Sequence, residues 1–92
     1  MDTIAKIPIL IIKEQELVIG PLAWYEAGKV SGLTVDQIHN SASFSGDAKE
    51  IIDQLVARYE RIFGKASHEV CKDAVREIVA TLPPEQVPAS LK

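Results

Sequence analysis

The segment from Gly46 to Leu82 constrains the fold most, because it carries apolar residues at helical spacing and is interrupted once, at Gly64. In its first half the apolar residues recur on one broad helical face; they are Ala48, Ile51, Ile52, Leu55, Val56, Tyr59, Ile62 and Phe63. Asp47 precedes this pattern as an N-cap, with Glu50 three residues later as in a capping box. We therefore predict a helix that begins after Asp47 and ends at Gly64, where glycine suits a C-terminal cap.

A second amphipathic helix is predicted from about Lys65 to Leu82. Its apolar positions are Val70, Cys71, Ala74, Val75, Ile78, Val79 and Leu82. They cover about half of the helical circumference, so this helix should be covered on two sides. Pro83 and Pro84 end it. We divide the chain accordingly into a single domain, residues 1–82, and a proline-rich C-terminal tail, residues 83–92, which we expect to be extended and partly mobile.

The N-terminal segment is predicted to form a β-hairpin. The run Ile7–Ile12 is rich in β-branched residues and short, which favours a strand, with Pro8 near its start. The polar residues 13–16 indicate a break, and Leu17–Ile19 then predicts a second short strand. The first strand is apolar on both faces, so it should need cover on both.

A short helix should follow, because Pro21 suits the first helical position and Gly32 suits a left-handed cap after it. It is predicted to run from Pro21 to Lys29 or Val30. A second hairpin is then predicted from the alternating segments Leu33–Val35 and Ala42–Phe44.

This second hairpin should turn near His39 and Asn40, where asparagine tolerates a positive φ. A helical turn over residues 36–39 is the alternative. The resulting order is β-β-α-β-β-α-α, an α+β fold in which a small antiparallel sheet of two hairpins and a short helix pack against a C-terminal helical hairpin.

Composition limits the size and surroundings of the protein. Its 92 residues allow one domain, and 47% hydrophobic with 25% charged residues is ordinary for a globular chain. Cys71 is the only cysteine, so no intramolecular disulfide can form, which favours a reducing compartment. The chain shows neither a signal peptide nor an apolar run long enough to cross a membrane. We expect a soluble, cytoplasmic protein that does not bind membranes.

Charge argues against nucleic-acid binding. The net charge is −3, and the ten lysines and arginines are scattered among acidic residues rather than gathered on one segment. Binding to a phosphate backbone requires a clustered basic surface.

The sequence offers little material for catalysis. His68 and Cys71 lie three residues apart on a predicted helix and could in principle ligate a metal, but a structural site usually needs four ligands. Cys71 also lies in the apolar stripe, where a free cysteine behaves as a small hydrophobic residue. The segment 28–32 does not match a phosphate-binding loop. We therefore predict no metal or other cofactor and a non-enzymatic role.

The candidate functional surface runs from Leu17 to Tyr25. Trp24 and Tyr25 lie off the centre of the apolar face of their helix, so they are either exposed or wrapped by the neighbouring strands. We predict partner or ligand contacts at Leu17, Ile19, Trp24 and Tyr25. The favoured role is a homodimeric interaction or regulatory domain, since a short chain with wide apolar faces often buries them by symmetric pairing. The alternative is a small-molecule sensor or carrier with an apolar pocket between the sheet and the helices, near Trp24 and Tyr25.

Overall fold

The computed structural model describes residues 3–92. It contains five α-helices and one two-stranded sheet, in the order α1 (Ile7–Ile19), α2 (Leu22–Ala27), β1 (Leu33–Asp36), β2 (Ser41–Phe44), α3 (Ala48–Phe63), α4 (Lys65–Ala74) and α5 (Arg76–Thr81). Short 3₁₀ turns cover Thr3–Lys6, Pro84–Gln86 and Ala89–Leu91. Helices and an antiparallel sheet are both present, as an α+β fold requires, but the order of the elements differs from the predicted one.

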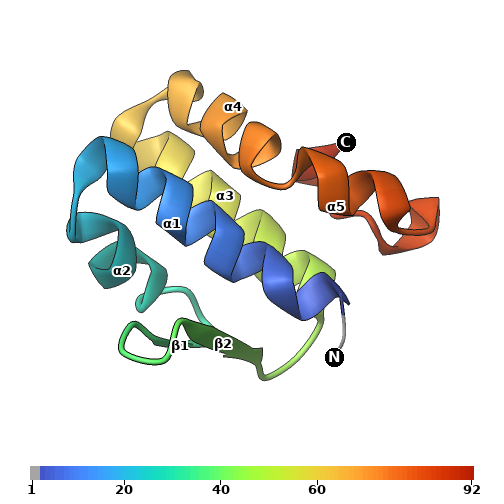
Figure 1. Cartoon of the computed structure of the whole chain (residues 1–92), viewed down its shortest axis with the longest axis horizontal. Coiled ribbons are helices and arrows are strands. Elements are labelled where there is room, and N and C mark those ends of the chain that lie inside the picture. Colours follow the sequence, from blue (N-terminus) through green and yellow to red (C-terminus); the bar gives the residue numbers. More distant parts are fainter. Residues whose placement is uncertain (1–2) are drawn as a thin grey trace.

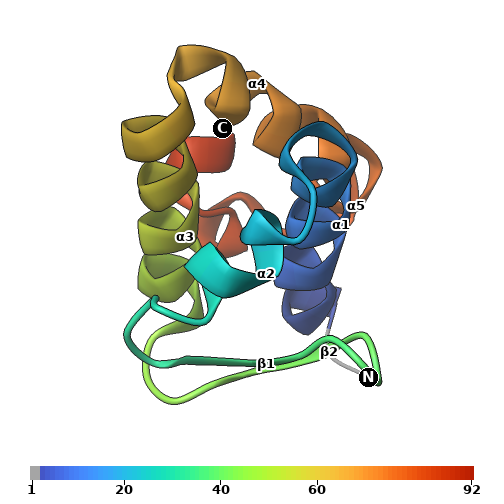
Figure 2. The ribbon, with the colours of Figure 1, turned by 90° about the vertical axis from the view of Figure 1, so that its left-hand side faces the viewer.

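The helices enclose one apolar core. Helices α1 and α3 form two long walls, and α4 packs against both of them (Figures 1 and 2). Helix α2 lies between these walls, and the β1–β2 hairpin crosses the end of the molecule below it (Figure 2). Among the described residues, the largest fully buried side chains include Tyr59, Ile11, Ile12, Ile52 and Leu55, which come from α1 and α3. None of the helices within residues 3–92 has both the length and the apolar character that a membrane crossing requires.

The predicted N-terminal hairpin is wrong, because Ile7–Ile19 forms the single helix α1. The buried residues Ile7, Ile11, Ile12 and Gln15 recur at helical spacing, so one face of α1 enters the core. Pro8 is tolerated in the first turn, where its missing N–H has no helical partner to lose. Residues 13–16 are therefore no turn: they continue the helix with favourable helix formers, and one of them points inward.

Helix α3 confirms the predicted caps. The Asp47 carboxylate accepts hydrogen bonds from the backbone N–H groups of Lys49 and Glu50, at 3.0 and 3.5 Å. Gly64 follows the last residue of α3 with a φ of 93°, and its N–H donates to the Glu60 carbonyl at 2.8 Å. Glycine adopts this positive φ without the steric cost that a Cβ would bring.

The second hairpin is also confirmed. Strands β1 and β2 pair antiparallel with Leu33 opposite Phe44, and Asn40 has a φ of 49°. The His39 ring nitrogen Nδ1 lies 2.6 Å from Asp36 Oδ2 across the turn. This bond, with a second one from the His39 backbone N–H, holds the pKa of Asp36 below its ordinary value.

The C-terminal region differs from the prediction in two ways. The second amphipathic segment bends at Val75, whose φ of −118° separates α4 from α5. Residues 83–92 are not extended: they form two 3₁₀ turns, and Val87 and Leu91 are buried in the core. The division into a domain at 1–82 and a separate tail stays a prediction.

Candidate functional site

Four large apolar side chains are exposed around the turn that joins α1 to α2. Leu17, Val18, Leu22 and Tyr25 are 80%, 65%, 49% and 61% exposed. We call these four residues the corner surface. They are four of the six large hydrophobic residues that are exposed in the described part of the chain, the others being Ile38 and Ile62. Such a grouping on a small domain is typical of an interaction site, whereas single exposed apolar residues are common anywhere.

The local sequence explains why these side chains face outward. The N–H of Gly20 closes the last turn of α1 onto the Glu16 carbonyl at 2.8 Å, with a φ of 72° that favours glycine. The chain then reverses, and the Ala23 N–H donates to the Gly20 carbonyl at 3.0 Å as α2 begins after Pro21. The buried face of α2 is formed by Ala23, Trp24, Glu26 and Ala27. Leu22 and Tyr25 are therefore left on its outer side.

Side-chain bonds tie α2 to both long helices. Trp24 Nε1 donates to Glu16 Oε2 of α1 at 3.0 Å. From α3, the Tyr59 hydroxyl donates to the Ala23 carbonyl at 2.6 Å. Arg58 of α3 donates from Nε to Glu26 Oε1 at 2.8 Å, and the Arg58 Nη2 atom lies 2.8 Å from the same oxygen. Partly buried charge-assisted bonds of this kind are stronger than exposed ones. The corner surface thus stands on a fixed support rather than on a loose loop.

The four residues predicted from sequence separate into two pairs. Leu17 and Tyr25 are exposed, so they are available for contacts. Trp24 is only 6% exposed and belongs to the core, which answers the question that the sequence left open for it. Ile19 is half-buried and packs against the core.

Sequence reasoning missed Val18 and Leu22. A strand places Leu17 and Ile19 on one face and Val18 on the other, whereas a helix places Leu17 and Val18 side by side and turns Ile19 inward. The period assigned to this segment therefore decided which residues were expected at the surface. If residues 7–19 are interpreted as a helix, the same sequence predicts that Val18 is exposed beside Leu17.

Charged residues flank the corner surface. Lys13 and Glu14 are exposed on α1 just before Leu17, and Lys29 follows Tyr25 beyond the end of α2. The Lys29 ammonium lies 4.2 Å from the centroid of the Tyr25 ring, a cation–π contact that fixes the lysine beside the aromatic face. The rim therefore carries both signs of charge, with Lys13 and Glu14 on the α1 side and Lys29 on the α2 side.

The side chains of His68 and Cys71 have different partners. The His68 ring lies between Glu60 Oε2, 2.7 Å from Nδ1, and the Ser90 carbonyl oxygen, 2.6 Å from Nε2. Cys71 is fully buried, and its Sγ accepts a hydrogen bond from Gln15 Nε2 at 3.4 Å. Burial raises the pKa of the Cys71 thiol from 9.0 to about 11. Within residues 3–92, no group of three or more His, Cys, Asp or Glu side chains is arranged to hold a metal ion.

A separate hollow of about 560 Å³ lies between the hairpin turn and the helices. Its apolar lining includes Ile9 and Leu10 of α1, Ala42 of β2 and Ile78 of α5, with polar atoms from His39 at the rim. This position matches the expected pocket between sheet and helices, but Trp24 and Tyr25 do not line it.

Comparison with known proteins gives no relative: no protein-family model, no curated protein and no solved structure matches this chain significantly.

Proposed function

We propose that this chain is a small interaction domain that forms a homodimer through the corner surface. The observation that carries the proposal is the concentration of four exposed apolar side chains within Leu17–Tyr25. Leaving these side chains in water costs free energy; full burial of an exposed side chain of this kind contributes about 1.5–3 kcal/mol, and the half-exposed Leu22 contributes less. The rigid attachment of α2 lowers the entropic cost of association, since little has to be ordered on binding.

A second copy of the same chain fits this surface because the rim carries both charges. Glu14 lies on the side that precedes Leu17, and Lys29 lies on the side that follows Tyr25. A two-fold axis through the apolar centre brings the rim of one copy against the rim of the other, and every contact is then made twice. A rim with both signs of charge can face its own copy, whereas a rim of a single sign would repel it.

The test is the mass of the purified protein in solution, measured by light scattering after size exclusion. We expect about twice the chain mass of 10.1 kDa. Leu17→Ser and Tyr25→Ser should each shift the equilibrium toward monomer, with a dissociation constant raised at least tenfold. Ile38→Ser is the matched control, because Ile38 is 87% exposed and lies outside the corner surface.

Two outcomes would contradict the proposal. One is a wild-type protein that stays monomeric at near-millimolar concentration. The other is a dimer that Ile38→Ser weakens as much as Leu17→Ser does. Leu17, Tyr25 and Ile38 are mostly exposed, so their substitution should leave the fold intact. Circular dichroism of each variant checks this independently.

A small-molecule carrier is a second candidate function, and the hollow beside the hairpin turn supports it. Its volume of about 560 Å³ is within the usual range for ligand pockets, and Ile9, Leu10 and Ile78 make part of its wall apolar. An apolar compound that raises the melting temperature would favour this function, because binding to the folded state stabilises it.

A further inference from the structure

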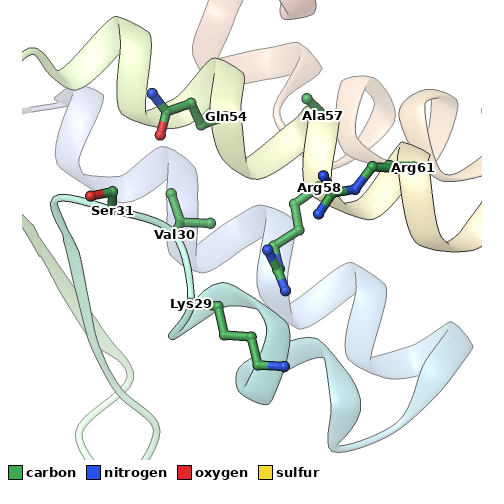
Figure 3. Close-up of a pocket in the computed structure, with 7 residues that line it drawn as sticks. All are labelled: Lys29, Val30, Ser31, Gln54, Ala57, Arg58 and Arg61. Carbon is green, nitrogen blue, oxygen red and sulfur yellow. The ribbon is translucent and has the colours of Figure 1, made fainter.

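A third feature is a hollow between α3 and the loop that follows α2, which adjoins the corner surface through the contact of Lys29 with the Tyr25 ring. Its volume is about 340 Å³. One wall is a stripe along α3, formed by Gln54, Ala57, Arg58 and Arg61 at helical spacing. The opposite wall is the segment Lys29–Ser31, as Figure 3 shows.

The charges around this hollow have one sign. Lys29, Arg58 and Arg61 are cationic, and no carboxylate belongs to the lining, although the chain as a whole has a net charge of −3. In Figure 3 the Arg58 side chain extends from α3 toward the segment that carries Lys29, and Arg61 lies one turn further along the same helix. Glu26 neutralises one of the three charges through its ion pair with Arg58. A local charge of about +2 remains on Lys29 and Arg61.

The donors that carry this charge are available to a ligand. The Arg61 side chain is exposed and has no hydrogen bond or ion pair with any residue in 3–92. The Lys29 ammonium contacts the Tyr25 ring but donates to no carboxylate in the described chain. Both Arg58 contacts use Glu26 Oε1 and involve Nε and Nη2, which leaves Nη1 free. An arginine fork beside a lysine is the arrangement that proteins use to hold phosphate oxygens.

The rest of the lining suits the body of a small polar molecule. Ser31 and Gln54 are exposed and supply neutral hydrogen-bonding groups on the two walls. Buried Val30 and the Ala57 methyl group make the surface between them apolar. The volume is at the small end of ligand pockets, which excludes a bulky ligand from being enclosed.

We infer that this hollow binds a small phosphate monoester, with the phosphate held by Arg61, Lys29 and the free edge of Arg58. A phosphate monoester carries a charge of −1.5 to −2 at neutral pH, which matches the local charge. Its short polar body would lie over Val30 and reach Ser31 or Gln54. This inference does not depend on the dimer.

The test is a titration of the ¹⁵N-labelled protein with glycerol phosphate, at constant ionic strength, with glycerol as the reference compound. We expect glycerol phosphate to change the amide chemical shifts of residues 29–31 and 54–61, and glycerol to leave them unchanged. Arg61→Gln should weaken binding about tenfold or more, since it removes a charge-assisted hydrogen bond. Ala57→Glu, which places a carboxylate in the hollow, should abolish binding. Arg76→Gln is the charge-matched control, because Arg76 pairs with Asp73 and lies outside this lining.

The inference is overturned if the amide chemical shifts change to a similar extent near every basic residue. It is equally overturned if Arg76→Gln weakens binding as much as Arg61→Gln does. It is also overturned if vesicles that display a phosphate-monoester lipid bind while glycerol phosphate does not, because the ligand would then be a surface. Mass measurements on Arg61→Gln separate this result from the dimer: the variant should remain dimeric, since Arg61 is not part of the corner surface.

Discussion

Gln15 shows how a polar residue can belong to the core. It is fully buried between α1 and α4, where its Nε2 donates to the Ser67 carbonyl at 2.9 Å and to Cys71 Sγ at 3.4 Å. Its Oε1 atom has no hydrogen-bond partner among the described residues. Burying an amide with one unpaired oxygen costs free energy, and the two hydrogen bonds that Gln15 does make hold only in one geometry. Gln15 therefore fixes how α1 docks on α4, in the middle of the segment whose polarity first indicated a turn.

The neighbouring thiol should be inert in the folded protein. Cys71 is fully buried, and burial raises its pKa to about 11, so the nucleophilic thiolate is scarce at neutral pH. We expect a thiol reagent to label Cys71 only as fast as the protein unfolds, and to label it at once in denaturant. Rapid labelling of the folded protein would contradict this burial.

The same shift predicts a dependence of stability on pH. The folded protein keeps the Cys71 proton to higher pH than the unfolded chain, where the pKa is near 9.0. The free energy of unfolding should therefore be unaffected by this group below about pH 8, and should fall as the pH rises through 9 toward 11. Cys71→Ala should lack this part of the alkaline slope.

At the scale of elements, the turn from α2 into β1 depends on Gly32. Its φ is +84°, and an added Cβ would lie 2.9 Å from both Ile51 Cδ1 and the Ser45 carbonyl oxygen. Gly32→Ala should lower the free energy of unfolding by about 2 kcal/mol or more, through backbone strain and this clash. Gly28→Ala is the matched control: its φ is −64° and the nearest atoms are at ordinary contact distance, so it should be neutral or stabilising by about 0.5 kcal/mol. Urea unfolding measures both.

The sequence predicted elements well where one local signal dominated. The Asp47 cap, Gly64 and the Asn40 turn each require a particular residue type, and the structure contains all three as expected. The strand prediction for residues 7–19 is wrong because isoleucine favours strands by itself, while burial of Ile7, Ile11 and Ile12 on one face stabilises a helix. Tertiary packing decided between the two, and a single sequence carries no direct record of it.

The candidate sites were less predictable than the fold, for a related reason. Leu17 and Tyr25 could be named from the sequence, but Val18 and Leu22 depended on the helical period of α1 and on the turn at Gly20. The basic hollow unites Lys29 with Arg61, which are distant in the chain. In the sequence, acidic residues lie between these cations. The fold brings the cations to one hollow whose lining contains no acidic residue.

On the scale of the whole molecule, the last ten residues close the core. Val87 and Leu91 are buried, and the 3₁₀ turn at Ala89–Leu91 packs against α3 and α4. Polar bonds align this segment: Asp53 Oδ1 accepts from the Ser90 backbone N–H at 3.0 Å and from the Ser90 hydroxyl at 2.6 Å. The Lys49 ammonium donates to the Glu85 carbonyl at 2.6 Å. Together with the His68 contact to Ser90, these bonds join the end of the chain to α3 and α4.

Removal of residues 83–92 should therefore destabilise the remaining chain strongly. Exposing the sites of Val87 and Leu91 costs about 3–5 kcal/mol, a large share of the 5–15 kcal/mol that is usual for a domain. At about 4–8 °C per kcal/mol for a chain of this size, the melting temperature should fall by about 12 °C or more. Removal of Lys92 alone is the control, because Lys92 is exposed and should leave the melting temperature unchanged. A truncated chain that melts within 2–3 °C of the full one, a difference of under about 1 kcal/mol, would instead mean that residues 1–82 form an independent domain and that the C-terminal segment is only an appendage.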